Sequence, residues 1–400
     1  MKILVINAGS SSLKFQLFDM DNEKVIAKGN CEKIGLEGSF IGFKTNGDKK
    51  EVAFNMPNHK VAIQKVFDVL TDKEDGVIKS VDEISAAGHR VVQGGWLFNE
   101  SVLITDEVLA KLKQLTDLSP LHAQANMAGV EGCKSVAPNI PQVLVFDTAF
   151  HATMPAKAYM YGINYEDYEK YHIRKYGFHG TSHRFVTQEV AKLMNKKPED
   201  LKIITVHLGN GSSITAVDHG KSVDTTMGLT PLEGLVMGTR SGDLDPSVVS
   251  YLAEKKGMTA TEVVNYLNKQ CGIAGVSGVS SDMRELNTAI KNGNERARLA
   301  LDMLIYRVKK YIGSYMAVLG GADAIVFTGG IGEHQEDLRE EALANMEYCG
   351  IEIDVEKNNN LPRGTVEEIS TPNSKVRVFR IPTDEELMIA RDTKRLVENK

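Results

Sequence analysis

Two short turns rich in glycine and serine have the residue types of a phosphate-binding site. The first is Gly9-Ser10-Ser11-Ser12, near the N-terminus, and the second is Gly209-Asn210-Gly211-Ser212-Ser213, in the middle of the chain. Glycine lets the backbone approach an anion closely, and consecutive N–H groups and small hydroxyls donate hydrogen bonds to its oxygens. We therefore expect each turn to hold phosphate oxygens, with Lys14 adding a positive charge to the first.

Four charged side chains elsewhere suit the transfer of a phosphoryl group. Arg90 and Arg240 carry planar forks that match carboxylate or phosphate oxygens, although either could instead make a local ion pair. Asp147 follows a buried strand, where α/β proteins collect ligands but where a carboxylate also caps the next element. Glu385 begins a helix, where the helix dipole favours an acid for structural reasons alone. Together with the two turns, these residues predict a phosphoryl-transfer site.

The sequence lacks the motifs of three other kinds of site. Neither a Walker GxxxxGK[ST] loop nor a GxSxG serine nucleophile occurs. His179 and His183 have the spacing of two zinc ligands, but no HExxH and no third ligand nearby accompanies them, so we expect no metal there. The glycines of Thr328–Gly332 follow a strand, which predicts either a flat surface for a nucleoside or a tight strand-to-helix turn.

The elements that carry these residues alternate between strands and helices. Residues 3–17 match residues 203–217 position by position, which predicts two β-hairpins in two related domains that share one phosphate. Apolar periodicity predicts helices over 59–70, 106–115 and 295–319, another helix ending near Val136, and strands over 84–92, 143–146 and 324–327. A C-terminal helix follows Pro382; Thr383 with Glu386 has capping-box spacing, and so has Asp282 with Glu285. This order predicts an α/β protein.

Composition is ordinary for a globular protein. The 400 residues suffice for two or three domains, and 42% are apolar and 25% charged. A net charge of −6 argues against a general nucleic-acid binder. The four cysteines are far apart, which favours reduced thiols over disulfides or zinc: Cys31, Cys133, Cys271 and Cys349. Neither a signal peptide nor a run near the ~20 apolar residues that span a bilayer occurs, so we expect a cytoplasmic protein without a membrane partner.

Several long blocks of the sequence together resemble the acetate kinase family, within the superfamily of acetate and sugar kinases, Hsp70 and actin. The resemblance spans the whole chain, and the order of so many blocks argues strongly against a chance match. The blocks that carry it are Asn7–Phe15, Asp147–His151, Tyr176–His183, His207–Gly211, Gly228–Gly234, Gly238–Pro246, Ser280–Arg284, Phe327–Glu333 and Pro382–Arg391.

This resemblance implies an α/β fold of two duplicated actin-like (ribonuclease H-like) ATPase domains with an interdomain cleft. Residues 1–150 with 386–400 would form the domain on the acyl and metal side, and residues 151–385 the nucleotide-binding domain. The resemblance also implies ATP and ADP as substrates, Mg²⁺ or alternatively Mn²⁺ as the cofactor, and a homodimer. The implied reaction is ATP + acetate ⇌ ADP + acetyl phosphate.

The resemblance also implies roles for individual residues. The metal would be held by Asn7 and Glu385, Asp147 would be the catalytic acid or base, and His179 and Arg240 would stabilise the transition state. Arg90 would bind the substrate carboxylate. A small apolar pocket for the acyl chain would comprise Val92, Leu121, Phe178 and Pro231. The nucleotide would be bound by Lys14, His207, Leu208, Gly209, Asn210, Gly211, Asp282, Met283, Arg284, Gly330, Ile331, Gly332, Glu333 and His334.

A carboxylic acid is already ionised at neutral pH, so as an acceptor it needs no general base, unlike a sugar hydroxyl. We therefore expect Asp147 chiefly to orient the metal or its waters. Two positions depart from the family pattern: Gln93 stands where the family usually has His, and Ala123-Gln124 where Asn-Pro is common. Neither coincides with an implied site residue.

Three alternatives remain open from the sequence. Propionate or butyrate differs from acetate by one or two methylenes, each worth only ~1–3 kcal/mol of selectivity, although Val92 and Phe178 would crowd a longer chain. A non-catalytic actin- or Hsp70-like ATPase would share the hairpins but would not need Arg90, Arg240 and an apolar pocket. A sugar kinase would need a polar pocket instead.

Overall fold

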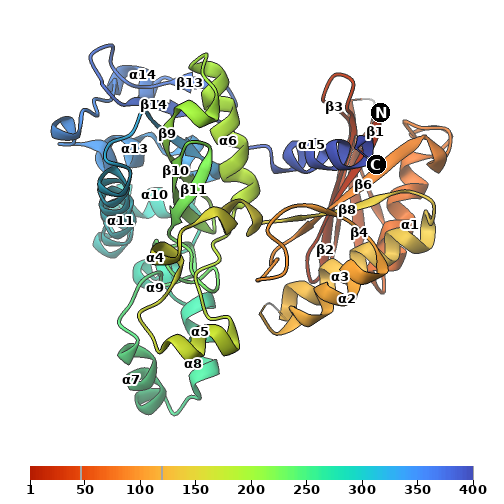
Figure 1. Ribbon diagram of the computed structural model, residues 1–400, viewed down its shortest axis with the longest axis horizontal. Helices are drawn as coiled ribbons and strands as arrows, with labels where there is room; N and C mark the ends of the chain where they lie inside the picture. Colours follow the sequence, from red (N-terminus) through yellow and green to blue (C-terminus); the bar gives the residue numbers. More distant parts are fainter. Residues whose placement is uncertain (46, 119, 400) are drawn as a thin grey trace. The chain divides into compact units, whose positions relative to one another are not determined.

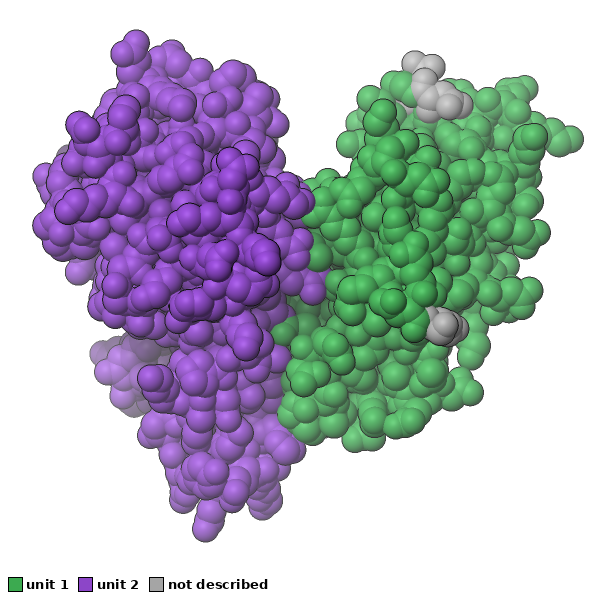
Figure 2. Space-filling view, turned by 45° about the horizontal axis from the view of Figure 1, so that its top comes forward, with its two compact units in different colours: residues 1–149, 384–400 green, residues 150–383 purple. Residues whose placement is uncertain are grey.

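The computed structural model describes residues 1–45, 47–118 and 120–399, while the side chains of residues 48, 117 and 120–122 fall outside the description. The chain divides into two compact units (Figure 1, Figure 2). Unit 1 comprises residues 1–149 and 384–400, and unit 2 comprises residues 150–383. Within the described residues, no helix combines the length and the apolar character needed to cross a membrane.

In the described part of unit 1, eight strands form one mixed sheet in the order β5-β4-β3-β2-β1-β6-β8-β7. They are β1 (Lys2–Ala8), β2 (Ser12–Asp19), β3 (Lys24–Glu32), β4 (Phe40–Thr45), β5 (Asp48–Ala53), β6 (Ile84–Val91), β7 (Val102–Leu103) and β8 (Gln142–Phe146). The helices are α1 (His59–Leu70), α2 (Asp106–Gln114), α3 (Pro120–Val136) and α15 (Glu385–Glu398). Strands β1, β6 and β8 run parallel, so their carboxyl ends meet at one edge of the sheet.

Alternate residues of β1 pack against different helices. Leu4 and Ile6 belong to the core beneath α1 and α3, whereas Ile3 and Val5 pack with Ile389 of α15. Strand β1 is therefore covered on both faces, by α15 on one side and by the α1–α3 layer on the other (Figure 1). This double burial explains why its sequence is a continuous apolar run rather than an alternating one.

Unit 2 is described throughout, and six of its strands form a second sheet in the order β11-β10-β9-β12-β14-β13. They are β9 (Lys202–Leu208), β10 (Ser212–Asp218), β11 (Lys221–Thr225), β12 (Ala324–Thr328), β13 (Glu367–Glu368) and β14 (Arg377–Arg380). Its helices are α4 (Ala156–Tyr159), α5 (Tyr165–Tyr171), α6 (Gly180–Leu193), α7 (Ser247–Lys256), α8 (Ala260–Lys269), α9 (Gly272–Ser277), α10 (Met283–Lys291), α11 (Glu295–Leu319), α12 (Gly329–His334), α13 (Glu336–Leu343) and α14 (Val355–Asn359).

Helices cover both faces of the β9 region as well. The long helix predicted over 295–319 is confirmed as α11, and its apolar side shares a core with Ile204 and Val206 of β9. Helix α6 lies against the opposite face, because its side chains bond to Thr205 and His207, the residues that alternate with those two. Polar groups of β9 are thereby buried beneath α6 rather than exposed.

Both predicted hairpins are present, but their registers differ by one residue. Asn7 lies opposite Lys14 across β1 and β2, whereas His207 lies opposite Ser213 across β9 and β10. The second turn is therefore one residue shorter than the first. As a result, the structural counterpart of Lys14 is Ser213, although the position-by-position match of the sequences pairs Lys14 with Ile214.

The predicted capping box at the start of the C-terminal helix is wrong. Asp384 caps α15 by accepting a hydrogen bond from the Leu387 N–H at 2.8 Å. The Thr383 hydroxyl instead pairs with Ser182 Oγ at 2.8 Å. An aspartate one residue later is at least as good an N-cap as threonine, and here it lies where the helix begins.

At α10 only half of the expected capping box forms. Asp282 is the N-cap and accepts from the Arg284 N–H at 2.8 Å. Its own N–H donates to Ser280 Oγ at 3.1 Å, so the reciprocal bond to Glu285 is not made. The serine two residues earlier provides a more local acceptor.

Candidate active site

In unit 1, four of the residues expected at the site form one polar cluster. Arg90 donates to both oxygens of Asp147, from Nε to Oδ1 at 3.0 Å and from Nη2 to Oδ2 at 2.6 Å. Its Nη1 lies 3.5 Å from Asn7 Oδ1, and its Nε lies 3.8 Å from Glu385 Oε2. The cluster lies at the carboxyl ends of β1, β6 and β8 and at the start of α15, so the sheet itself brings these residues together.

The charges of this cluster depend on one another. Asp147 is only 1% exposed, while Arg90 and Glu385 are 23% and 21% exposed. Burial alone would lower the pKa of Arg90, but Asp147 and Glu385 more than compensate and raise it above its usual value. Burial raises the pKa of Glu385 to about 7; Arg90 opposes this rise, whereas Asp147 and Glu386 add to it. Several carboxylates around a single guanidinium favour the binding of a further cation.

The donor set fits Mg²⁺, which prefers amide and carboxylate oxygens and usually keeps waters and substrate phosphates as its other ligands. Asn7 supplies an amide oxygen and Glu385 a partly exposed carboxylate. In the part of the chain that the structure describes, no group of three or more His, Cys, Asp or Glu side chains is arranged to hold a metal ion. A metal at this cluster would therefore depend on few protein ligands and on the substrate.

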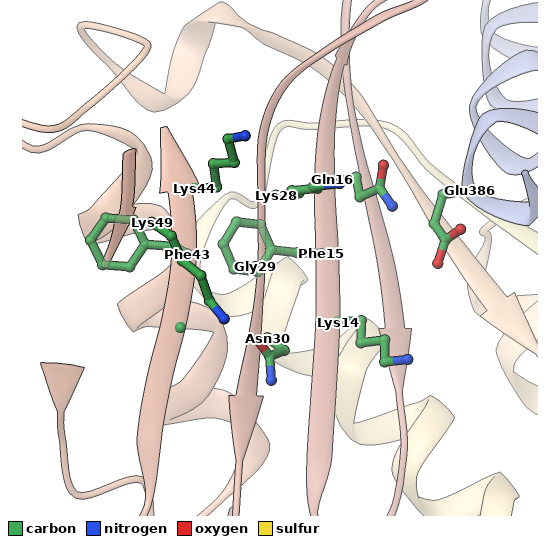
Figure 3. A pocket seen from close by; sticks show the side chains of 11 residues that line it. Lys14, Phe15, Gln16, Lys28, Gly29, Asn30, Phe43, Lys44, Lys49 and Glu386 are labelled. Carbon is green, nitrogen blue, oxygen red and sulfur yellow. The ribbon is translucent and has the colours of Figure 1, made fainter. Parts of the chain in front are cut away.

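Lys14 belongs to a basic surface of unit 1. It lies opposite Asn7 in the first hairpin and lines an open cavity of 380 Å³ over β2, β3 and β4. Three other lysines and an acid line the same cavity: Lys28, Lys44, Lys49 and Glu386. Figure 3 shows the Lys14 ammonium on the side of the cavity where Glu386 lies. The surface beside the first glycine turn thus carries the positive charge that phosphates require.

Sequence reasoning missed a residue that supports this cluster. Asn126 of α3 donates from Nδ2 to the carbonyl of Ala8 at 3.2 Å and accepts from the Val92 N–H at 3.4 Å. A lone asparagine in an amphipathic helix gives no signal of such a bridge. At the atypical Gln93, Oε1 accepts from the Gly95 N–H at 2.9 Å, while Nε2 is buried without a hydrogen-bond partner among the described residues.

In unit 2, Arg240 and His179 both adjoin the second glycine turn. A Cβ placed on Gly211 would lie 3.3 Å from Arg240 Nη1 and 3.3 Å from His179 Nε2. Arg240 Nη1 also donates to the carbonyl of Pro231 at 3.1 Å. Burial lowers the pKa of Arg240, and no carboxylate among the described residues pairs with it. A partly buried guanidinium without an acid, beside a glycine turn, is suited to a bound anion.

The backbone before α6 is strained where His179 sits. His179 is the N-cap of α6 and has a φ of 55°, a left-handed backbone conformation that residues other than glycine seldom adopt. Two residues earlier, Gly177 has a φ of 73°, and a Cβ there would lie 2.4 Å from Thr225 Cγ2 and 2.8 Å from the ring of His151. Such strain costs about 1–3 kcal/mol and is typical of functional sites.

His179 is also the end of a buried hydrogen-bond network that the sequence did not predict. Its Nδ1 lies 2.8 Å from Ser213 Oγ, which in turn lies 2.7 Å from Nε2 of His183. His183 Nδ1 then lies 2.7 Å from Thr205 Oγ1. The HxxxH spacing thus does place two histidines on one side of a helix, but the atom between them is a serine oxygen.

A second histidine of the site stacks on the first. The rings of His179 and His207 have centroids 4.2 Å apart and an interplanar angle of 24°. His207 Nδ1 lies 2.8 Å from Ser182 Oγ, which also contacts Thr383. Two stacked imidazolium ions would repel each other, so the stack favours at most one charged ring.

Two further histidines beneath the site are neutral. Burial lowers the pKa of His151 to about 4, and its Nε2 donates to the carbonyl of Phe178 at 2.8 Å. Burial also lowers the pKa of His183 well below its usual value, and neighbouring His151 and His207 add to that effect. Neither residue was expected at the site, although both lie in blocks that carry the family resemblance, His151 in Asp147–His151 and His183 in Tyr176–His183.

The segments expected to bind the nucleoside lie next to the second hairpin. Helix α12 begins at Gly329, whose φ is 77° and where a Cβ would lie 2.6 Å from the carbonyl oxygen of Leu208. Of the two readings of this glycine cluster, the tight strand-to-helix turn is present, and the nucleoside surface stays a prediction. Asn287 Nδ2 of α10 donates to Gln335 Oε1 at 2.9 Å, which links α10 to the end of α12.

The two halves of the expected acyl pocket lie in different units. Val92 and Leu121 belong to unit 1, although the side chain of Leu121 is outside the described part of the chain. Phe178 and Pro231 belong to unit 2, where Phe178 is buried. The pocket therefore stays a prediction.

Comparison with known proteins gives a consistent result along the whole chain. The model of the acetokinase family matches residues 2–391. The acetate kinase of Desulfitobacterium hafniense (strain DSM 10664 / DCB-2) is 56% identical over 399 residues, and the match covers 100% of both chains. The crystal structure of Porphyromonas gingivalis acetate kinase is 49% identical with a TM-score of 0.96, and a propionate kinase from Francisella tularensis is 42% identical with a TM-score of 0.92. Each structural match covers 99% of both chains.

This agreement confirms the predicted α/β fold with actin-like ATPase domains. The family model and a relative of equal length both align with nearly the whole chain, and the polar clusters of the two units contain the expected residues. The chain therefore belongs to the acetokinase family.

Proposed function

We propose that this enzyme transfers the γ-phosphoryl group of ATP to a carboxylate oxygen of acetate, in a reversible reaction that yields ADP and acetyl phosphate. The observation that carries the proposal is the Asn7, Arg90, Asp147 and Glu385 cluster in a chain whose full-length relative is named an acetate kinase. In a direct in-line transfer, the new bond joins phosphorus to the carboxylate oxygen, and the bond from phosphorus to the ADP oxygen breaks. No proton needs to move.

The main obstacle is repulsion between the anionic acceptor and the anionic phosphate. At ~4 Å, two unit charges repel by about 4 kcal/mol at an effective dielectric of ~20. Arg90 binds the acetate, while Arg240 and Lys14 provide positive charge for the phosphates, and His179 donates an N–H to the phosphoryl oxygens of the transition state. Arg240 has no acidic partner in the described residues, which favours an enzyme over a non-catalytic ATPase.

The nucleotide is held in unit 2. His207 to Gly211 of the second hairpin contact its phosphates, and residues 282–284 and 330–334 surround the nucleoside. Support for this comes from the Asn287–Gln335 bond and from Gly329, which keep these segments close to the hairpin. The acyl group lies against Val92, Leu121, Phe178 and Pro231.

Asn7 and Glu385 would hold Mg²⁺, or Mn²⁺ in its place. When bound, the ion would neutralise charge on the β- and γ-phosphates. Asp147 orients Arg90 rather than acting as a base, because both of its oxygens already accept hydrogen bonds from Arg90. This arrangement keeps Arg90 in position and leaves Asp147 close to Glu385.

Propionate is the second candidate acceptor, because the similar Francisella tularensis structure is that of a propionate kinase. The deciding assay traps acyl phosphate with hydroxylamine in reactions containing ATP, Mg²⁺ and either acetate, propionate or butyrate. We expect the highest kcat/KM with acetate. A higher value with propionate would reassign the substrate, and no hydroxamate with any of the three would refute the proposed function.

The proposal extends to the working form of the protein. As the family resemblance implies, the enzyme is a homodimer that acts in the cytoplasm on small molecules. The net charge of −6 supports the absence of a nucleic-acid partner. Light scattering coupled to size-exclusion chromatography tests the oligomeric state, for which we expect twice the mass of a 43.9 kDa chain.

A further inference from the structure

A line of four hydrogen-bonding groups connects Thr205, in the middle of β9, to His179 at the second glycine turn. The links are Thr205 Oγ1 to His183 Nδ1 at 2.7 Å, His183 Nε2 to Ser213 Oγ at 2.7 Å, and Ser213 Oγ to His179 Nδ1 at 2.8 Å. Thr205, His183 and Ser213 are each 0% exposed, so water does not complete their hydrogen bonding.

The number of hydrogens in this line limits how it can be arranged. His183 is neutral, because burial lowers its pKa well below the usual value, and it therefore carries one N–H. Ser213 has one hydroxyl hydrogen but touches two imidazole nitrogens, so it donates to one ring and accepts from the other. Only two arrangements satisfy both conditions.

In the first arrangement, the hydrogen of His183 is on Nδ1 and points to Thr205 Oγ1. The hydroxyl hydrogen of Thr205 then has no acceptor, because His183 is its only hydrogen-bond partner among the described residues. A buried donor without an acceptor is costly and rare. Ser213 would donate to His183 and accept from Nδ1–H of His179.

In the second arrangement, every buried hydrogen finds an acceptor. Thr205 donates to His183 Nδ1, His183 Nε2–H donates to Ser213, and Ser213 donates to His179 Nδ1. We infer that the line has this direction and that it fixes His179 as the neutral tautomer with its hydrogen on Nε2. Thr205, His183 and Ser213 are then positioning residues.

The tautomer decides what His179 presents to the second glycine turn. Its Nε2 is the nitrogen near Gly211, where a Cβ would lie 3.3 Å away. With a hydrogen on Nε2, the ring donates toward this region without adding a charge. The neutral form is also favoured by the N-terminus of α6, which carries a partial positive charge at His179. The opposite tautomer would present a lone pair, which repels phosphate oxygens.

The tautomer itself does not depend on the proposed function, whereas its catalytic consequence rests on it. Long-range proton–nitrogen correlation spectra of the full-length protein, labelled with ¹⁵N-histidine and recorded near neutral pH, report which ring nitrogen carries hydrogen. The His179 signals are those that disappear in His179→Gln. We expect hydrogen on Nε2 and an unprotonated Nδ1. Hydrogen on Nδ1, or on both nitrogens, would overturn the inference whether or not the enzyme uses acetate.

Kinetics of Ser213 variants test the catalytic consequence. Ser213→Ala removes the donor to His179 Nδ1, so we expect kcat to fall roughly tenfold or more, toward the ~10²–10³ loss typical of a missing transition-state donor. The KM values for ATP and acetate should stay within about twofold, and Ser213→Thr, which keeps the hydroxyl, should recover most of the rate. Thr215→Val is the matched control, since this buried hydroxyl of β10 pairs with Thr225 outside the line.

The kcat of the double variant Ser213→Ala/His179→Gln distinguishes a positioning role of Ser213 from a merely structural one. If Ser213 acts through His179, adding Ser213→Ala to His179→Gln causes no further loss of kcat, because coupled residues are not additive. An equal loss in both backgrounds would contradict the positioning role. Should Ser213→Ala fail to fold, the spectra of the unmodified protein still decide the direction of the line.

Discussion

Arg90 donates to both carboxylate oxygens of Asp147, at 3.0 Å and 2.6 Å, and these bonds fix the plane of its guanidinium group. Charge-assisted bidentate bonds of this kind are among the strongest hydrogen bonds in proteins. The remaining nitrogen, Nη1, lies 3.5 Å from Asn7 Oδ1, at the carboxyl ends of the parallel strands. Asp147 thus determines how Arg90 can meet a substrate, which makes it an orienting residue before any direct chemical role.

Asp147→Asn tests this interpretation. The amide cannot hold Arg90 as a carboxylate does, so we expect kcat/KM for acetate to fall by about 10²–10³. The substitution also removes negative charge beside Glu385, so we expect partial recovery at raised Mg²⁺ or Mn²⁺ concentration. A steady-state assay over metal concentration measures both effects. A loss that follows the protonation of the substrate instead would indicate that Asp147 is a base.

Glu368→Gln is the matched control for this substitution. Arg377 holds Glu368 with the same bidentate geometry, from Nε at 2.9 Å and from Nη2 at 2.5 Å, between β13 and β14. We expect its loss to leave the kinetic constants unchanged. If both variants lose activity equally, the effect of Asp147→Asn reflects general destabilisation.

Arg240→Ala removes the guanidinium that has no acidic partner in the described residues. We expect kcat to fall by roughly 10²–10³, equivalent to about 3–4 kcal/mol of transition-state stabilisation. Arg296→Ala provides the comparison, because this exposed arginine bonds, within the described part of the chain, only to the carbonyls of Val276 and Gly275. Near-normal turnover of a correctly folded Arg240→Ala enzyme would refute the assigned role.

Arg339 is expected to affect nucleotide binding from a distance. Its side chain is 1% exposed and donates to the carbonyl of Gly332 at 2.8 Å and to Asn358 Oδ1 at 2.7 Å. The bond to Gly332 holds α12 in place. Arg339→Met should raise the KM for ATP more than the KM for acetate. It should also lower the free energy of unfolding by about 1–3 kcal/mol, because it leaves buried acceptors without their donor.

Arg380→Met separates these two effects. Arg380 is a second buried arginine whose hydrogen bonds go to the carbonyls of Pro362 and Thr365 rather than to the carbonyl of Gly332, although its charge also acts on Glu333 of α12. Its replacement should destabilise the protein similarly while raising the KM for ATP less than Arg339→Met does. An unchanged KM for ATP in both variants would show that Arg339 does not position the nucleotide segment.

Buried neutral histidines predict a loss of stability in mild acid. The pKa of His151 is lowered to about 4 in the fold, against 6.5 as its ordinary value. Its contribution to stability is therefore complete above pH 6.5 and is lost as the pH falls toward 4, by about 3 kcal/mol in total. The pKa of His183 is shifted in the same direction, so it adds to this loss.

Urea unfolding of the protein and of His151→Gln, at a series of pH values between these limits, measures this dependence. Glutamine can still donate to the carbonyl of Phe178, so the variant should have a shallower pH slope. His219→Gln, at a side chain that is 65% exposed, is the control and should keep the full slope. An unchanged slope in His151→Gln would contradict the assignment.

Much of the cluster in unit 1 could be predicted because a polar residue lies at or just after the carboxyl end of each of its parallel strands. Asn7 and Asp147 follow continuous apolar runs, Arg90 lies one residue before the end of β6, and parallel strands bring such ends to one edge. The hairpin register could not be predicted in the same way. Sequence similarity matches positions, but the shorter second turn shifts the partner of His207 to Ser213.

The histidine network was beyond sequence analysis for a different reason. The spacing of His179 and His183 shows that they are one helical turn apart, but their partners depend on how α6 packs on the buried face of β9 and β10. Likewise, Thr383 had the spacing of a helix cap. In the fold the Thr383 hydroxyl pairs with Ser182, and the adjacent Asp384 caps the helix instead.

The central claim is that a carboxylate oxygen of acetate attacks the γ-phosphorus of ATP. Phosphorus NMR of the reaction with [¹⁸O₂]acetate tests it directly, because ¹⁸O bonded to phosphorus shifts the resonance of the product. We predict acetyl phosphate in which one ¹⁸O is bonded to phosphorus, and no such product when acetate is omitted. Acetyl phosphate without ¹⁸O on phosphorus, or ATP hydrolysis in place of transfer, would contradict the account.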